Sequence, residues 1–183
     1  MLSFTPEQIV SSQARIAENV KVGKYTIIED DVDIEEDVEI GNFCMICSGT
    51  RIGKGTVIKN YVEIRKNTQI GSGCYIDSQV AFSGSSVIGN KVTLRYGTII
   101  ARGVRIGDGT YVAPRVMTNN LDQNLDQVGG ANIGSNCFIS TNVVLQHGIT
   151  VADNVVVGTL AFVNKDCEEG NVYVGVPARK LHS

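Results

Sequence analysis

The chain has 183 residues, 43% of them hydrophobic, and a formal net charge of −3 at pH 7. This length favours one domain with a sizeable buried core. The small negative charge and the lack of like-charge blocks argue against a nucleic-acid partner, and no apolar run is long enough to span a membrane.

The N-terminal segment, residues 1–15, precedes a regular pattern and is predicted to be a cap. It lacks the basic region and the long apolar core of a signal peptide. Without an export signal, the five cysteines indicate reduced thiols and a cytoplasmic protein. Thr5 and Pro6 suit the start of a short helical turn, which would shield the open end of the fold from strand addition.

From Ile16 to Val112 the sequence repeats every six residues. A large apolar residue stands at each of seventeen consecutive steps, thirteen of them isoleucine, and Val, Thr, Cys or Ser follows four positions after each. That small residue lies two positions before the next large one, and residues two apart share a face of a strand. Each hexad therefore points one bulky and one small side chain inward. A helix is excluded because six is not a multiple of 3.6 and β-branched residues dominate.

Residues 117–132, which contain the stretch MTNNLDQNLDQVGGA, interrupt this repeat. The pattern resumes at Ile133, which lies three hexads plus three positions after Val112. A simple continuation is impossible, so the chain is predicted to leave the repeat and return. The repeat domain is predicted to span residues 16–168, followed by a C-terminal cap over residues 169–183.

Tandem [Ile/Leu/Val]-[Gly/Ala/Asp/Glu]-x-x-[small]-x segments resemble the hexapeptide repeat of the left-handed parallel β-helix. The resemblance implies an all-β prism of roughly eight triangular coils, stacked about 4.8 Å apart, with one extended loop. Hexapeptide proteins of this length resemble homotrimeric acyltransferases that use acetyl-CoA or a related thioester. In such proteins the active sites lie in clefts between neighbouring subunits.

The C-terminal sequence resembles the ending of such transferases. In VVVGTLAFVNKDCEEGNVYVGVPARKL, a Gly-x-x-small segment leads to a Lys-Asp pair and a Gly-x-Pro-Ala-Arg close, with Val176 where the family has Asn. The resemblance implies an acetyl-CoA site here, with small residues along a pantetheine arm and cations near phosphates. The candidate cofactor-binding residues are Ser140, Gly158, Thr159, Lys165, Arg179 and Lys180.

Ser140 and Gly158 are three hexads apart, so they are expected to stack on successive coils, with Val176 next in that line. Small residues there would let an extended thioester arm approach the backbone. The alternative is that Gly158 is one more corner glycine and that the terminal cations only solubilise the chain.

Asn119 and His147 are the candidate catalytic residues. The segments YVAPRVMTNN and VGGANIGSN, which flank the interruption, resemble transferases that N-acetylate nucleotide-linked amino sugars, and this implies that Asn119 orients the acceptor. An Asn pair that faces the amine in some of these enzymes is replaced by Tyr96-Gly97, which weakens the amino-sugar assignment. His147 would act as a general base, although it stands where the family has proline; a coil-edge histidine without a catalytic role is the alternative.

The interruption at 117–132 is interpreted as a flap that closes over the pantetheine or acceptor. Its duplicated NLDQ carries hydrogen-bond donors and acceptors on both copies. The alternative is a tolerated surface loop.

No metal is expected to be required. The CMIC sequence has metal-like spacing, but a zinc site needs four ligands, and Cys44 occupies an inward small position. The γ-class carbonic anhydrases share the β-helix and need three zinc histidines, whereas this chain has only His147 and His182. The acidic residues between 28 and 40 suit either Ca²⁺ or Mg²⁺, or a solvated face.

The sequence therefore predicts an acyltransferase that moves an acetyl or similar group from a CoA thioester to an amine or hydroxyl. The acceptor is expected to be a small polar molecule, a sugar or a nucleotide-linked sugar, and the protein a homotrimer without nucleic-acid or membrane partners. The alternative is a non-catalytic scaffold or assembly subunit that keeps the fold and has lost the site.

Overall fold

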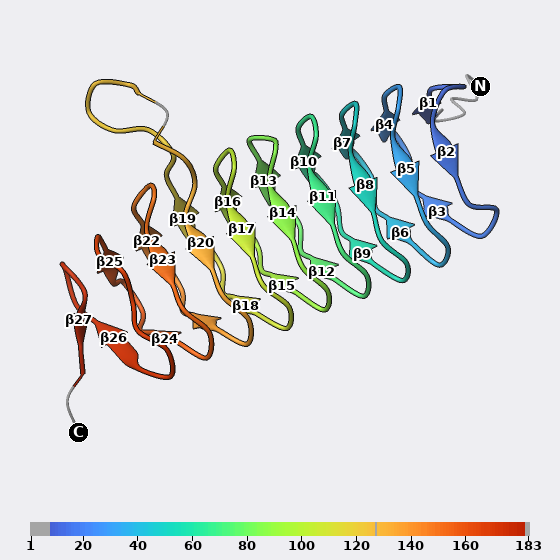
Figure 1. Ribbon diagram of the computed structural model, residues 1–183. Coiled ribbons are helices and arrows are strands. Elements are labelled where there is room, and N and C mark those ends of the chain that lie inside the picture. Colours follow the sequence, from blue (N-terminus) through green and yellow to red (C-terminus); the bar gives the residue numbers. More distant parts are fainter. Residues whose placement is uncertain (1–7, 127, 182–183) are drawn as a thin grey trace, which may run out of the picture.

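The computed structural model describes residues 8–126 and 128–181, which form strands and turns with no helix among them. Figure 1 shows a prism whose coils advance from the N-terminus to the C-terminus, with strands on three flat faces. The chain descends on the near face, crosses at the bottom and rises on the far face while it advances from right to left, which is a left-handed sense (Figure 1). Strands of successive coils pair in parallel. The predicted β-helix is confirmed, with about nine turns instead of eight.

Three parallel sheets, named A, B and C in the order in which the chain visits them, make up the faces. Sheet A contains β1 (Ile9–Val10), β4 (Ile27–Ile28), β7 (Met45–Ile46), β10 (Glu63–Ile64), β13 (Ala81–Phe82), β16 (Ile99–Ile100), β19 (Met117–Thr118), β22 (Val144–Leu145) and β25 (Phe162–Val163). Sheet B contains β2 (Arg15–Ile16), β5 (Asp33–Ile34), β8 (Arg51–Ile52), β11 (Gln69–Ile70), β14 (Val87–Ile88), β17 (Arg105–Ile106), β20 (Asn132–Ile133) and β23 (Thr150–Val151). Sheet C contains β3 (Lys21–Val22), β6 (Glu39–Ile40), β9 (Val57–Ile58), β12 (Tyr75–Ile76), β15 (Thr93–Leu94), β18 (Tyr111–Val112), β21 (Phe138–Ile139), β24 (Val156–Val157), β26 (Val172–Val174) and β27 (Arg179–Lys180).

The turns between sheets form three corners, named AB, BC and CA after the sheets that they join. The second strand residue of nearly every hexad points inward and is buried; Ile16 and Val22, near the N-terminal end, are only partly covered. From Thr26 onward the small partner residues are buried as well. Most of the threonines among them bond across coils, whereas Thr68 bonds to Arg65 O in its own turn and Thr50 Oγ1 has no partner among the described residues. Of those that bond across coils, Thr110 donates its hydroxyl to Gly134 O at 2.7 Å and accepts the Cys137 N–H at 3.0 Å. Such bonds explain how a hydroxyl is tolerated in an aliphatic core.

Strand pairing extends beyond both predicted limits of the repeat domain. At the start, β1 pairs with β4 in sheet A, within the segment assigned to the N-terminal cap. At the end, β26 pairs in parallel with β24, and β27 then folds back antiparallel onto β26 (Figure 1). The helical turn predicted around Thr5 and Pro6 lies outside the described residues. Within the described part of the chain there is no helix that could cross a membrane.

The interruption lengthens one coil by one and a half hexads. Ile88 pairs with Ile106, three hexads later, whereas Ile106 pairs with Ile133, four and a half hexads later. The same excess separates β19 from β22, because Met117 pairs with Val144. The extra residues project from the prism as one long loop after β19 (Figure 1). Both flanking strands stay in register, so the predicted departure and return of the chain are confirmed.

All five cysteines are buried and none forms a disulfide. Burial, with a smaller contribution from Asp166, raises the pKa of the Cys167 thiol to about 11 from an ordinary value of 9.0. A raised folded-state pKa means that the thiol contributes its full stability below pH 9 and loses it as pH rises toward 11. We expect Cys167→Ala to flatten the alkaline loss of stability between pH 9 and 11 relative to the wild type. Urea denaturation at pH 8 and pH 10.5 measures this; parallel losses in both proteins would contradict it.

Candidate functional site

The loop after β19 folds back over the AB corner of the following coil. The Val128 N–H donates to Asn120 O at 3.1 Å, which closes the base of the loop, and the Gly148 N–H donates to Gly129 O at 3.1 Å. The Val128 side chain lies over Gly148, since a Cβ built there would stand 3.5 Å from Val128 Cγ1. The returning arm of the loop therefore contacts the turn that carries His147.

The loop has internal order of its own. The Asp122 carboxylate accepts the N–H groups of Asn124, at 2.9 Å, and Asp126, at 3.0 Å. Leu125 at its tip is exposed. A loop with a defined turn and an apolar tip is suited to packing against another surface.

Asn119 and His147 lie at the same AB corner in adjacent coils. The register of β19 and β22 places Asn119 beside Gln146, and the Asn119 N–H donates to Leu145 O at 3.0 Å. The Asn119 side chain is exposed, and His147 is half-buried. The structure thus brings the two candidate catalytic residues together beside the loop.

Two buried polar atoms at this corner have no hydrogen-bond partner among the described residues. They are Nδ1 of His147 and Oδ1 of Asn164, and Asn164 stands beside Gln146 in the next coil. Nε2 of His147 lies 3.4 Å from Nε2 of Gln146. Since the Gln146 amide nitrogen can only donate, this contact favours the tautomer with the proton on Nδ1. Unpaired buried polar atoms are uncommon and mark a place where a ligand or water group would be bound.

The candidate cofactor residues Ser140 and Gly158 stack on successive coils at the CA corner, as predicted from their spacing. The expectation that Val176 continues this line is wrong. Val157 pairs with Tyr173, a separation two positions short of three hexads, so Val174 follows Gly158 instead. A Cβ on Gly158 would stand 2.8 Å from Val174 Cγ1. Glycine is therefore favoured at position 158, where the last turn packs on this corner.

The CA corner changes character along the prism. In the early coils, side chains cap the turn amides: Asn42 accepts the Lys24 N–H at 2.8 Å, and Asn60 accepts the Asn42 N–H at 2.8 Å. In the late coils, the N–H groups of Thr141 and Thr159 have no acceptor within the described residues. Two free amides one coil apart suit the carbonyl oxygens of an extended pantetheine arm.

Of the four candidate residues beyond Gly158, three lie on the sheet C side of the prism and one, Lys165, lies at the AB corner. Thr159 and Arg179 belong to the CA side, where Arg179 pairs with Val174 across the final hairpin and is exposed. Lys180 is held by an ion pair with Glu168, at 2.9 Å. Lys165 follows β25 at the AB corner, one coil beyond His147, so it does not join the line of Ser140 and Gly158.

Acidic residues between 28 and 40 form ion pairs with basic residues of neighbouring coils. Asp33 bridges Arg15 and Arg51 at 3.0 and 3.1 Å, and Glu39 pairs with Lys21 at 2.6 Å. Among the described residues no group of three or more His, Cys, Asp or Glu side chains could hold a metal ion. Cys44 is buried, and its thiol donates to Lys59 O at 3.0 Å, as expected for an inward small residue.

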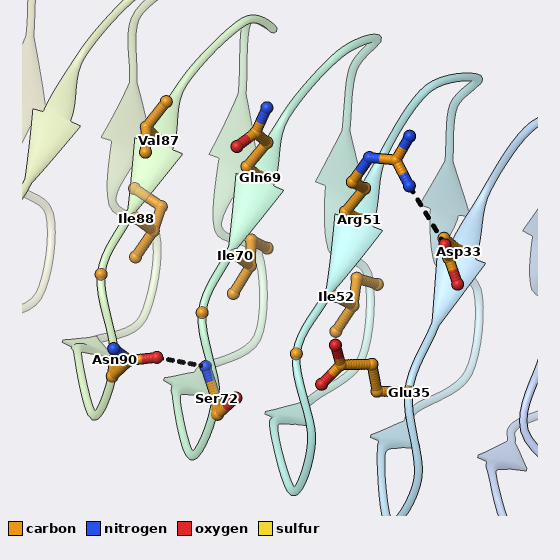
Figure 2. Close-up of a pocket in the computed structure, with 13 residues that line it drawn as sticks. Asp33, Glu35, Arg51, Ile52, Gln69, Ile70, Ser72, Val87, Ile88 and Asn90 are labelled. Atoms are coloured by element: carbon orange, nitrogen blue, oxygen red, sulfur yellow. Dashed lines mark hydrogen bonds and ion pairs between the residues drawn. The ribbon is translucent and has the colours of Figure 1, made fainter.

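Sheet B carries a hollow of about 400 Å³ on the N-terminal half of the prism. Figure 2 shows its lining side chains as a ladder on successive coils, with Arg51 turned toward Asp33 and Ser72 bonded to Asn90. The Arg51 and Asp33 side chains and the Ser72 N–H and Asn90 side chain bond to each other in pairs, and none of the candidate site residues lines the hollow. We therefore regard its lining residues as links between successive coils and not as a ligand site.

Comparison with known proteins agrees with the repeat. The Bacterial transferase hexapeptide (six repeats) family matches residues 13–48, 31–66 and 49–84. Galactoside O-acetyltransferase of Escherichia coli K12 is 33% identical over 87 residues, and this match covers 43% of the chain and less than half, 43%, of that enzyme.

Solved structures share the fold at low sequence identity. A UDP-N-acetylglucosamine acyltransferase superposes with a TM-score of 0.64 at 17% identity, over 94% of this chain and 70% of the other. The UDP-N-acetylglucosamine acyltransferase of Arabidopsis gives a TM-score of 0.58 at 18% identity, over 96% and 72% of the two chains. The family model thus matches residues 13–84, and the same hexad continues through the solenoid to Val163, so the chain is similar to hexapeptide-repeat transferases in sequence pattern and in fold.

Proposed function

We propose that this protein transfers an acetyl or similar acyl group from a CoA thioester to an amine or hydroxyl of a small sugar, free or nucleotide-linked. The observation that carries the proposal is the long loop that interrupts the prism after β19, which returns across the corner of His147 beside unpaired buried atoms. The family and the acetyltransferase relative support the reaction class.

CoA enters as a co-substrate, and the CA corner suits it. The free amides of Thr141 and Thr159 would bond the pantetheine arm, and Arg179 would face its phosphates. Ser140 and Gly158 have small side chains, so the pantetheine arm could approach the backbone along this line.

In the proposed reaction the acceptor nitrogen or oxygen attacks the thioester carbonyl, the new amide or ester bond forms, and the C–S bond breaks. His147 would remove the proton of the acceptor through Nε2 and return it to the leaving thiolate, so that free CoA thiol is released. Asn119, exposed beside Gln146, would hold the acceptor by hydrogen bonds. Acceptor and thioester belong to different corners of one prism, so a neighbouring copy is needed to bring them together.

The outer face of sheet A is suited to contact a second copy. Its outward residues are nearly all apolar: Ile9, Ile27, Met45, Ala81, Ile99, Met117, Val144 and Phe162, with Glu63 the exception. At the same hexad position sheet B is mostly polar, with Val87 the exception: Arg15, Asp33, Arg51, Gln69, Val87, Arg105, Asn132 and Thr150. An apolar face beside both candidate corners supports a homotrimer in which sites form between subunits.

Acetyl-CoA is expected to stabilise the wild-type protein by about 2.7 kcal/mol at one hundred times its Kd. His147→Ala should keep this stabilisation and lose about 100-fold or more in kcat, because a general base contributes on that order. Thermal shift and thiol-release assays over amino sugars and sugar alcohols measure the two effects. No stabilisation by acetyl-CoA or longer thioesters would overturn the transferase assignment and favour a scaffold. Full turnover by His147→Ala would remove only the histidine from the mechanism.

A further inference from the structure

A separate hollow of about 410 Å³ lies on the AB corner, on the N-terminal side of the loop. Its lining includes three cationic side chains, the carboxylate of Glu63 and a run of small residues: Arg65, Lys66, Arg102, Glu63, Ser83, Gly84 and Ser85. None of these residues belongs to the site described above. The hollow shares its corner with Asn119 and His147.

Lys66, Gly84 and Arg102 occupy the same position on three successive coils. The register of β10, β13 and β16 aligns them, since each stands three hexads after the one before. Gly84 has a φ of +104° and is buried. A Cβ there would approach Lys66 O to 3.0 Å, which favours glycine at this position. With no side chain between the two cations, Gly84 leaves the floor of the hollow open.

The floor of the hollow also offers backbone donors. At the BC corner the equivalent amides are capped by the next coil: Asn90 accepts the Ser72 N–H at 2.9 Å, and Asp108 accepts the Asn90 N–H at 2.7 Å. At the AB corner the next coil presents Gly84 to Lys66 and Arg102 to Gly84, and neither side chain can accept. The N–H groups of Lys66 and Gly84 have no acceptor within the described part of the chain. Stacked free amides form a site that favours anions.

The charge of the hollow is only partly balanced. Arg65 pairs with Glu63 at 2.7 Å. Lys66 and Arg102 form no ion pair among the described residues, and both are exposed. Two unpaired cations beside two free amides match a ligand with two adjacent anionic groups.

We propose that this hollow binds the diphosphate of a nucleotide-linked acceptor, an inference that rests on the proposed acyl transfer. Gly84 stands three coils before His147, about 14 Å along the corner. A diphosphate at Gly84 therefore directs an attached sugar along the corner toward Asn119 and the loop. CoA also contains a diphosphate, but the free amides of Thr141 and Thr159 with Arg179 favour its placement at the CA corner.

The test measures binding of UDP, GDP, ADP, CoA and pantetheine by calorimetry, without any acyl transfer. Arg102→Gln and Lys66→Gln are each expected to weaken UDP or GDP about tenfold, the usual effect of losing a charged hydrogen bond. CoA and pantetheine affinities should be unchanged. Lys91→Gln, the same charge change on an exposed residue of the BC corner, is the control and should alter nothing.

Each outcome decides the assignment. Weakened CoA with unchanged UDP and GDP would place the nucleotide of CoA in the hollow and overturn the acceptor role. Unchanged affinities in both variants, or no binding of UDP, GDP or ADP to the wild type, would overturn the site itself. If the diphosphates bind as expected and no acetyl-CoA binding is found, the hollow stands and the proposed acyl transfer fails.

Discussion

Deletion of residues 120–128 is expected to leave the prism folded and to reduce acyl transfer by about 100-fold or more, the order expected when a bound substrate is misplaced. The loop accounts for the excess of one and a half hexads over the regular coil. Without it, Thr118 and Ile133 stand one hexad apart, so the repeat continues through Gly129, Gly130 and Ala131. Gly130 already packs on the coil below, because a Cβ there would stand 2.4 Å from Val104 N.

The deletion separates the two interpretations of the loop. A melting temperature and an oligomeric state like those of the wild type, together with lost thiol release, would support a flap over the site. Replacing the same segment by a Gly/Ser linker of equal length is the matched control, since it keeps the length of the loop and removes its side chains, among them Asp122, Leu125 and Val128. Unchanged kinetics in the deletion variant would show that the loop has no part in turnover.

The repeat could be predicted because every hexad carries one large and one small residue at the two inward positions of a strand and turn. Ile106 and Ile133 are aligned by inward packing, and the sequence shows the break between them without showing its shape. The end of the prism could not be predicted in the same way. Tyr173 replaces an aliphatic residue after a turn two positions short of the repeat, so Val174 and not Val176 follows Gly158.

The candidate site was predicted in part, because a three-hexad spacing identifies neighbours only inside the regular coils. Ser140 and Gly158 stack for that reason. Asn164, whose Oδ1 is unpaired beside Gln146, follows from the same spacing after Gln146 and was missed because amides on a turn carry no distinctive signal. Lys165 and Arg179 are both near the C-terminus of the sequence, but they lie at different corners of the prism. Their closeness in sequence therefore did not show that they are apart in the structure.

Replacing Phe82 by alanine is expected to lower the free energy of unfolding by about 3–5 kcal/mol. Phe82 is 1% exposed and lies between Ile64 and Ile100 in sheet A. The small residue of its hexad is Ser86, which cannot fill the space, so a cavity would remain. Phe82→Leu keeps most of the volume and puts a residue like Leu94 in the same hexad position; it should cost less than about 1.5 kcal/mol.

The same pair of variants also reports on the cationic hollow at Lys66 and Arg102, because Phe82 directly precedes Ser83 and Gly84. A cavity beneath this turn would loosen the stacked amides, so Phe82→Ala should also weaken binding of UDP or GDP, whereas Phe82→Leu should retain it. Urea denaturation and calorimetry on the two variants measure both effects. Equal destabilisation by alanine and leucine would mean that aromatic shape, not volume, is what this coil requires, and would contradict the cavity argument.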